Sequence, residues 1–222
     1  MTDAFYTDAQ RRVQAEHGSQ PLADTMEFAI VTDTIPDDHA QFIASRDFFF
    51  LSSVNSNGEP TVSHKGGGVG VVRILDPKTI AFPAYDGNGM FLSLGNIADT
   101  AKIGLLFIDF ETPHRVRVQA TARYTTDLNA DPELAGTWPG AIGIVHATVD
   151  SVFVNCARYI HPHTRVEPSK YVPDENGQQP HASWKRIDLL QDSLSAEDQA
   201  RTADEGTITM EDYADRLAAG ES

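Results

Sequence analysis

Cysteine is nearly absent from this chain: Cys156 is the only one among 222 residues. A single thiol excludes an intrachain disulfide, which is typical of proteins kept in a reducing compartment. Cys156 follows an apolar stretch at residues 152–154 that predicts a β-strand. We therefore expect its thiol to be a small core group and not a nucleophile.

Long apolar runs are also missing. No stretch of 18 apolar residues occurs, so we expect no membrane-spanning helix. Residues 1–5 lack the basic segment followed by an apolar one that marks a secretory signal. Together with the single cysteine, this predicts a cytoplasmic protein. The 41% hydrophobic content still suffices for a sizeable core, so we do not expect a wholly disordered chain.

Basic residues are scarce. There are 17 Lys and Arg against 32 Asp and Glu, and the formal charge of −15 argues against nucleic-acid and anionic-membrane partners. The charge is uneven: residues 187–222 hold ten acidic and two basic side chains, whereas residues 61–125 hold five acidic and seven basic ones. The less negative segment would suit a pocket for a phosphorylated cofactor, although an uneven surface alone would give the same pattern.

Several familiar site motifs are missing as well. The chain contains no Gly-x-Ser-x-Gly nucleophile elbow, no P-loop and no dinucleotide-binding glycine fingerprint after a strand. The nearest histidine cluster, His146 with His161 and His163, has no carboxylate or cysteine at a familiar metal-ligand spacing. We therefore expect no metal site, and the pattern marks no side chain as a catalytic acid or base.

Helical spacing is confined to a few segments. Residues 2–16 predict a helix, a loop-rich stretch follows, and residues 36–43 predict a short second helix. Residues 89–97 and 209–219 predict two further amphipathic helices.

Strand-like segments fill the middle of the chain. Turn-bounded runs of aromatic, β-branched or alternating residues predict strands at residues 47–54, 61–65, 69–75, 79–83, 103–110, 114–124 and 142–156. Short strands with one helical interruption indicate an antiparallel barrel. We predict a mainly β fold with flanking helices (α+β). Its parts would be an N-terminal helical segment (1–41), a β-barrel domain (42–157) and an acidic extension (158–222) that packs on the barrel or on a partner chain.

Residues 63–68, Ser-His-Lys-Gly-Gly-Gly, combine three features at the end of a predicted strand. Ser63 supplies a hydroxyl, His64 and Lys65 supply donors, and the glycines allow the backbone to approach a ligand closely. This combination suits a phosphate, but a glycine-rich hairpin with an exposed lysine would look the same.

Two other segments could also hold an anion. Residues 81–90 run from a strand through a Gly/Asn turn into a predicted helix, whose first amides would be unpaired; the alternative is a helix start capped by Asn88. Arg115 and Arg117 alternate with valines, so both point to one face of a strand. That face is either a solvated edge or a site for an anionic or electron-rich ligand.

Five blocks of the chain occur in the order typical of one family. They are residues 60–67 (PTVSHKGG), 72–76 (VRILD), 81–97 (AFPAYDGNGMFLSLGNI), 104–112 (GLLFIDFET) and 115–118 (RVRV). Over roughly residues 42–156 the chain resembles the pyridoxamine 5′-phosphate oxidase-like flavoproteins, and its N-terminal helix is similar to that of the shorter bacterial members.

The resemblance implies an antiparallel split β-barrel, a homodimer, and FMN bound at the dimer interface. It places Lys65 near the flavin phosphate or ring, Asn88 at the phosphate, and Arg115 where the true oxidases have a ring-contacting glutamine. The cofactor-binding residues we expect are Ser63, His64, Lys65, Pro83, Ala84, Tyr85, Asn88, Gly89, Met90, Arg115 and Arg117.

The chain departs from the true oxidases in two places. Where they carry an Arg-Lys pair after the position of Asn88, this chain has Gly89 and Met90, so other cations would have to compensate. Their substrate segment with Arg and Trp has only residues 184–186 (Trp-Lys-Arg) as a counterpart, inside an acidic tail.

The resemblance therefore implies an FMN-dependent oxidoreductase that moves a hydride or electrons between a small substrate and the flavin, and not a vitamin B6 oxidase. The alternative on the same barrel is a non-catalytic binding or carrier protein for flavin, haem or deazaflavin (F420).

Overall fold

The computed structural model describes residues 4–221 and divides into two compact units, residues 1–167 and 168–222. The first unit holds all seven strands and the second holds only helices among the described residues. No helix in the described part of the chain is both long and apolar enough to cross a membrane.

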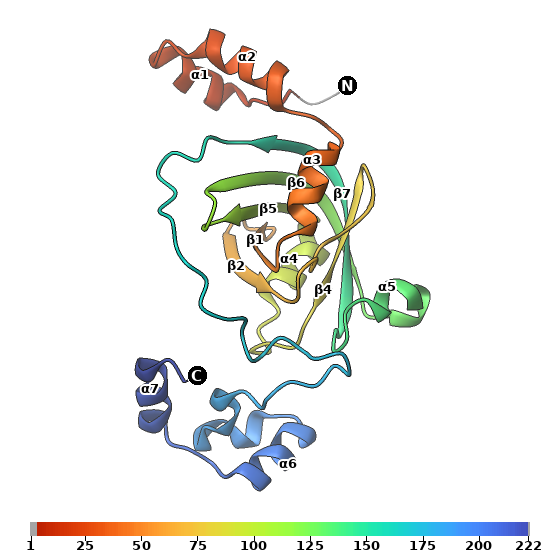
Figure 1. Cartoon of the computed structure of the whole chain (residues 1–222), viewed down its shortest axis with the longest axis vertical. Coiled ribbons are helices and arrows are strands. Elements are labelled where there is room, and N and C mark those ends of the chain that lie inside the picture. The colour runs from red at the N-terminus through yellow and green to blue at the C-terminus, as the bar shows by residue number, and fades with distance from the viewer. Residues whose placement is uncertain (1–3, 222) are drawn as a thin grey trace. The chain divides into compact units, whose positions relative to one another are not determined.

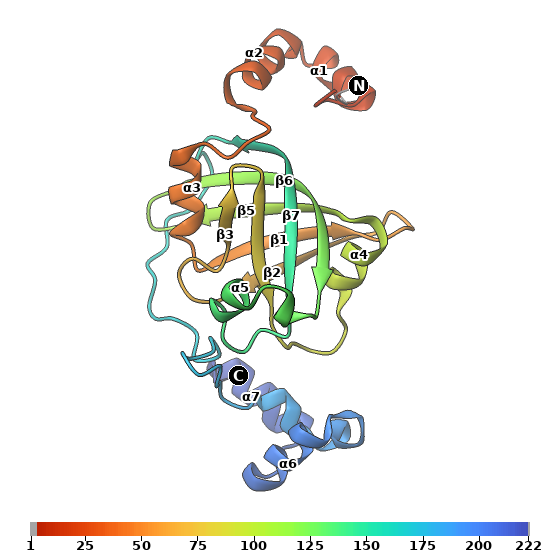
Figure 2. The ribbon, with the colours of Figure 1, turned by 90° about the vertical axis from the view of Figure 1, so that its right-hand side faces the viewer.

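Seven strands form one sheet in the first unit. They are β1 (Phe48–Val54), β2 (Pro60–Gly66), β3 (Arg73–Asp76), β4 (Thr79–Ala84), β5 (Lys102–Asp109), β6 (His114–Thr125) and β7 (Gly143–Val154). Their order is β2-β1-β5-β6-β7-β4-β3, and every neighbouring pair is antiparallel. Figures 1 and 2 show the strands wrapping around a common core. The predicted mainly β, antiparallel architecture is confirmed.

Strand alternation places the core inside the curved sheet. On β6, Val116 and Val118 are buried while Arg117 between them is exposed. On β1, Phe49 and Leu51 point inward in the same way and pack with Phe107 of β5. One face of the sheet is therefore a continuous apolar interior, and the other carries the polar and half-buried side chains.

Helices cover parts of this unit. They are α1 (Asp8–Glu16), α2 (Gln20–Ile30), α3 (Asp37–Ala44), α4 (Leu92–Thr100) and α5 (Pro132–Gly136), with the 3-10 turn η1 (Leu128–Ala130). Ile43 of α3 and Ile97 of α4 are buried in the core. Asn96 of α4 donates hydrogen bonds to Ser53 of β1 (3.0 Å) and Thr61 of β2 (3.3 Å). These contacts fix the position of α4 against the two strands.

The N-terminal helices differ from our prediction. The first helix begins at Asp8, where Thr7 forms a capping box with Gln10, and residues 2 and 3 of the predicted helix lie outside the described residues. The stretch expected to be loop-rich contains α2. Pro21 lies in the first turn of α2, where a proline fits because its missing N–H would have no helical partner.

The predicted third strand is wrong in its first half. Residues 69–72 form a loop in which Gly70 has φ +78°, and β3 begins only at Arg73. Val71 and Val72 are nevertheless buried in the core, so their apolarity reflects burial of a loop and not strand pairing.

The prediction that the Cys156 thiol is a core group is also wrong, because β7 ends at Val154 and the thiol is exposed.

The second unit contains η2 (Ser183–Arg186), η3 (Asp188–Ser193), α6 (Ala196–Glu205) and α7 (Met210–Ala219). The helix predicted at 209–219 is confirmed, with Thr209 as its capping residue. Helix α6 was not predicted, because its acidic sequence lacks an apolar stripe. Its start is set by Ser195, which accepts a hydrogen bond from the Asp198 amide.

Candidate cofactor site

A cavity of about 320 Å³ lies in the first unit, bounded by the ends of β2 and β4 and by the segment that leads into α4. Strands β2 and β4 do not pair with one another, since they lie towards opposite ends of the strand order. The cavity therefore lies between two strands that are not neighbours in the sheet. Its size falls within the range of small-molecule sites, about 300–1,000 Å³.

Apolar side chains form the inner wall of the cavity. Phe49 and Phe82 meet edge to face, with ring centroids 5.1 Å apart, and both are buried. Leu51 and Val71 line the same region. Such a wall suits a flat aromatic ring system, because it offers dispersion contacts and no competing polar atoms.

Hydroxyl and amide groups lie on the opposite side. The Ser63 hydroxyl of β2 lies 3.1 Å from the Ser93 hydroxyl of α4, and both line the cavity. The Asn88 side-chain oxygen accepts a hydrogen bond from the Met90 amide at 3.1 Å. Tyr85 is half-buried, and burial raises the pKa of its phenol, so the phenol remains a neutral donor at neutral pH.

Lys65 of β2 lines the cavity. Its side chain is half-buried, and within residues 4–221 no recorded hydrogen bond or ion pair engages its ammonium. Burial lowers the pKa of Lys65, since the charged form loses hydration and gains no carboxylate in return. A partly desolvated cation of this kind is most readily explained by an anionic group that binds beside it.

The structure brings together nine of the eleven residues that we expected to bind a cofactor. The nine that line the cavity are Ser63, His64, Lys65, Pro83, Ala84, Tyr85, Asn88, Gly89 and Met90. Arg115 and Arg117 do not line it.

The two arginines lie on the outer face of the sheet, because Val116 and Val118 take the inward positions on β6. Arg115 donates from Nη2 to the Cys156 carbonyl at 3.0 Å, while its Nε is buried and has no hydrogen-bond partner within residues 4–221. Burial lowers the pKa of Arg117, and repulsion from Arg115 adds to this effect.

The helix beside the cavity starts later than predicted. Helix α4 begins at Leu92, and Phe91 before it adopts the left-handed conformation with φ 49°. Asn88 is therefore part of the preceding loop and does not cap the helix.

Leu92, Ser93 and Leu94 line the cavity although sequence reasoning did not select them. The serine within a predicted helix start was the signal that could have identified this contribution.

The comparison with protein families matches residues 35–156 to the pyridoxamine 5′-phosphate oxidase model, from just before α3 to just after β7. This match covers more than half of the chain. The chain belongs to the pyridoxamine 5′-phosphate oxidase-like family. The family resemblance noted in the five sequence blocks is thereby confirmed.

Several solved structures are similar to this chain over 54–64% of its length. HupZ of Group A Streptococcus is 21% identical, with a TM-score of 0.45 over 54% of this chain and 93% of that one. An FMN-binding protein from Syntrophomonas wolfei is 13% identical, with a TM-score of 0.37 over 64% and 96%. HutZ, the haem storage protein from Vibrio cholerae, is 12% identical, with a TM-score of 0.36 over 55% and 94%. No curated protein matches the chain.

Proposed function

We propose that this protein binds FMN in the cavity between β2, β4 and α4 and acts as an oxidoreductase that moves a hydride or electrons between a small substrate and the flavin. The observation that carries this proposal is Lys65, a half-buried ammonium that has no partner among the described residues, in the cavity of a chain that belongs to the pyridoxamine 5′-phosphate oxidase-like family.

The cavity residues fit the parts of FMN by their chemistry. The aromatic wall of Phe49 and Phe82 suits the ring, while the hydroxyls of Ser63 and Ser93 suit polar atoms of the ring or the ribityl chain. Lys65 offers a charge for the phosphate dianion or for the electron-rich edge of the ring. The bound flavin would supply the redox chemistry, and the protein would supply binding, orientation and exclusion of water.

The loop at Gly89 and Met90 sets a limit on this fit. Gly89 adopts φ +74° and Met90 is exposed, so neither position contributes the cations found in the true oxidases. Lys65 would then carry more of the phosphate charge than its counterparts do. A second candidate is a non-catalytic carrier of flavin, haem or deazaflavin (F420). The chain has only residues 184–186 as a counterpart of the substrate segment of the true oxidases, and a carrier needs no substrate site.

A second copy of the chain would complete the site. Across the outer face, His64, Phe50, Leu106, Arg117 and Phe153 form one row in register over β2, β1, β5, β6 and β7. Val62 beside this row is 71% exposed. We propose that a homodimer covers this face and brings Arg115 and Arg117 close to the cavity of the partner.

The dimer predicts a specific effect of charge reversal at the outer face. Arg117→Glu should convert the dimer to a monomer and weaken FMN binding at the same time, because the buried face would gain an unpaired carboxylate. Light scattering coupled to gel filtration, with Arg123→Glu on the same strand as the control, measures this. A wild-type protein that is monomeric at micromolar concentration would contradict the proposal.

The proposed activity is tested by reduction of the bound cofactor. After FMN is bound, NADH or NADPH should bleach the flavin absorption under anaerobic conditions, and air should restore it. A flavin that binds tightly but is bleached by neither donor would favour the carrier. A Soret band in the purified protein, or uptake of F420 in place of FMN, would identify the other carrier alternatives.

A further inference from the structure

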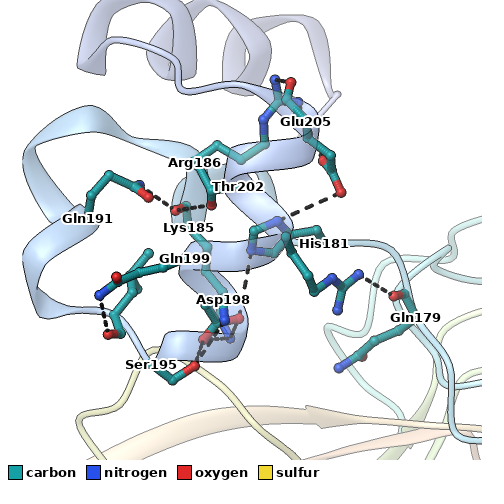
Figure 3. A network of polar contacts seen from close by, with 12 residues as sticks. Gln179, His181, Lys185, Arg186, Gln191, Ser195, Asp198, Gln199, Thr202 and Glu205 are labelled. Carbon is teal, nitrogen blue, oxygen red and sulfur yellow. Dashed lines mark hydrogen bonds and ion pairs between the residues drawn. The ribbon is translucent and has the colours of Figure 1, made fainter.

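His181 is a buried histidine in the second unit, outside the proposed cofactor site. Its side chain is only 1% exposed, and neither ring nitrogen has a hydrogen-bond partner in the part of the chain that the structure describes. Two carboxylates face the ring: Asp198 Oδ1 lies 3.7 Å from Nε2 and Glu205 Oε1 lies 3.8 Å from Nδ1 (Figure 3). Both distances exceed those of a hydrogen bond. The imidazole ring is therefore buried, and its two nitrogen atoms make no hydrogen bond to another described group.

Both carboxylates already have cationic partners. Asp198 accepts two hydrogen bonds from the Lys185 ammonium at 2.9 and 3.0 Å, and a third from the Ser195 hydroxyl at 2.9 Å. Glu205 faces the Arg186 guanidinium at 3.7 Å. These contacts, all within η2, α6 and the serine that caps α6, leave little uncompensated negative charge for a further cation.

A third cation also faces His181. Arg201 of α6 donates to the Gln179 carbonyl at 3.1 Å and repels a proton on the imidazole. Among the described residues, the charged groups near the ring include Asp198 and Glu205, and also Lys185, Arg186 and Arg201. Adding a proton to His181 would bury a charge between carboxylates that other cations already engage, so the neutral ring is the form that fits.

We propose that His181 makes the second unit acid-sensitive: protonation of the imidazole releases α6 from η2. The contacts that would open are polar. Thr202 of α6 donates to the Lys185 carbonyl at 3.3 Å, and Arg186 of η2 donates to the carbonyls of Glu205 and Gly206 at 2.8 Å each. The ion pair between Lys185 of η2 and Asp198 of α6 joins the same two elements. Helix α6 has ten residues and only Thr202 is buried, so these polar contacts, and not apolar packing, hold it against η2.

The direction of the pH effect follows from linkage. Burial lowers the pKa of His181 below its ordinary value of 6.5, and repulsion from Arg201 adds to this. The open form therefore takes up a proton more readily than the closed form. The stability of the closed form relative to the open form is greatest above about pH 6.5. It is lost as the pH falls towards the lower pKa that His181 has in the closed form.

Asp198 acts in a different pH range. Burial raises the pKa of its carboxyl, but hydrogen bonds from Lys185 and Ser195 outweigh this and hold it below the ordinary 3.8. The stability that Asp198 contributes is present above about pH 4 and is lost only in stronger acid. A loss of stability between pH 7.5 and 5.5 therefore separates His181 from Asp198.

Hydrogen–deuterium exchange on the full chain tests the proposal, with rates corrected for the intrinsic effect of pH. Between pH 7.5 and 5.5 the opening constant of α6 should rise by up to about tenfold, the limit for uptake of one proton by a group of pKa 6.5. His181→Gln should abolish this rise, because the amide does not titrate. His163→Gln, which changes an exposed histidine of the first unit, should leave the rise intact.

Two results would overturn the proposal: an α6 exchange rate that does not respond to pH in the wild-type chain, or a response that persists in His181→Gln. If that variant fails to fold at pH 7.5, Arg201→Gln replaces it. Removing this cation should shift the opening to lower pH. An unchanged pH midpoint in Arg201→Gln would equally overturn the assignment.

Discussion

Lys65→Met is expected to weaken FMN binding by about 1.5–3 kcal/mol, or about 10- to 150-fold, because it removes one charge-assisted hydrogen bond from a partly desolvated site. Methionine keeps much of the length and the apolar stem of the lysine, so the cavity wall at this position stays filled. Fluorescence titration of free FMN with each variant measures the two dissociation constants.

Lys78→Met is the matched control for this prediction. Lys78 is exposed at the turn between β3 and β4, where its ammonium lies 2.8 Å from Asp33. Its replacement should leave FMN affinity unchanged. Equal affinity of wild type and Lys65→Met would mean that the anionic part of the ligand does not lie beside β2.

Affinity for FMN should also fall at alkaline pH. Burial lowers the pKa of Lys65, so the free protein loses this charge at a lower pH than an exposed lysine would. Because FMN binds the charged form better, the dissociation constant should rise as the pH approaches that pKa from below. In Lys65→Met this rise should be missing, which separates Lys65 from other titrating groups.

Phe107→Ala is expected to lower the free energy of unfolding of the first unit by about 3–5 kcal/mol. Phe107 lies on β5, is fully buried, and has its ring centroid 5.6 Å from that of Phe49. Alanine would leave a cavity that the surrounding strands can close only in part, since each is fixed by its ladder of hydrogen bonds.

The two tryptophans allow this loss to be assigned to the first unit. Trp138 lies in the first unit and Trp184 in the second, so urea unfolding followed by fluorescence in a Trp184→Phe background reports on the sheet. Val166→Ala is the control, because that side chain is 93% exposed in the first unit and its replacement should cost no more than about 0.5 kcal/mol. A similar midpoint for the two variants would contradict the described core.

The sheet could be predicted because its signal is local. Alternation of Val116 and Val118 with arginines identifies one buried face of a strand, and the strands of this chain are long enough to show it. The prediction failed where apolar residues are buried but are not paired in a strand. Val71 and Val72 are apolar because a loop inserts them into the core, and no property of so short a segment distinguishes this from a strand.

The parts of the candidate site that are formed by short continuous segments of the chain could be predicted. The segments around Lys65 and Tyr85 both line one cavity, as their composition indicated. The alternation with valines places Arg117 on the outer face, but its separation from the cavity was not predictable, since that depends on how the sheet curves in three dimensions. His181 escaped notice for a related reason: its enclosure by η2 and α6 arises from tertiary contacts, and α6 shows no apolar stripe.

The central claim is that the cavity between β2, β4 and α4 holds FMN. The most direct test is the absorption spectrum of the purified protein, combined with mass identification of the cofactor that it releases on denaturation. The account predicts a yellow protein with flavin absorption bands and the mass of FMN. A colourless protein that takes up no added FMN would contradict it.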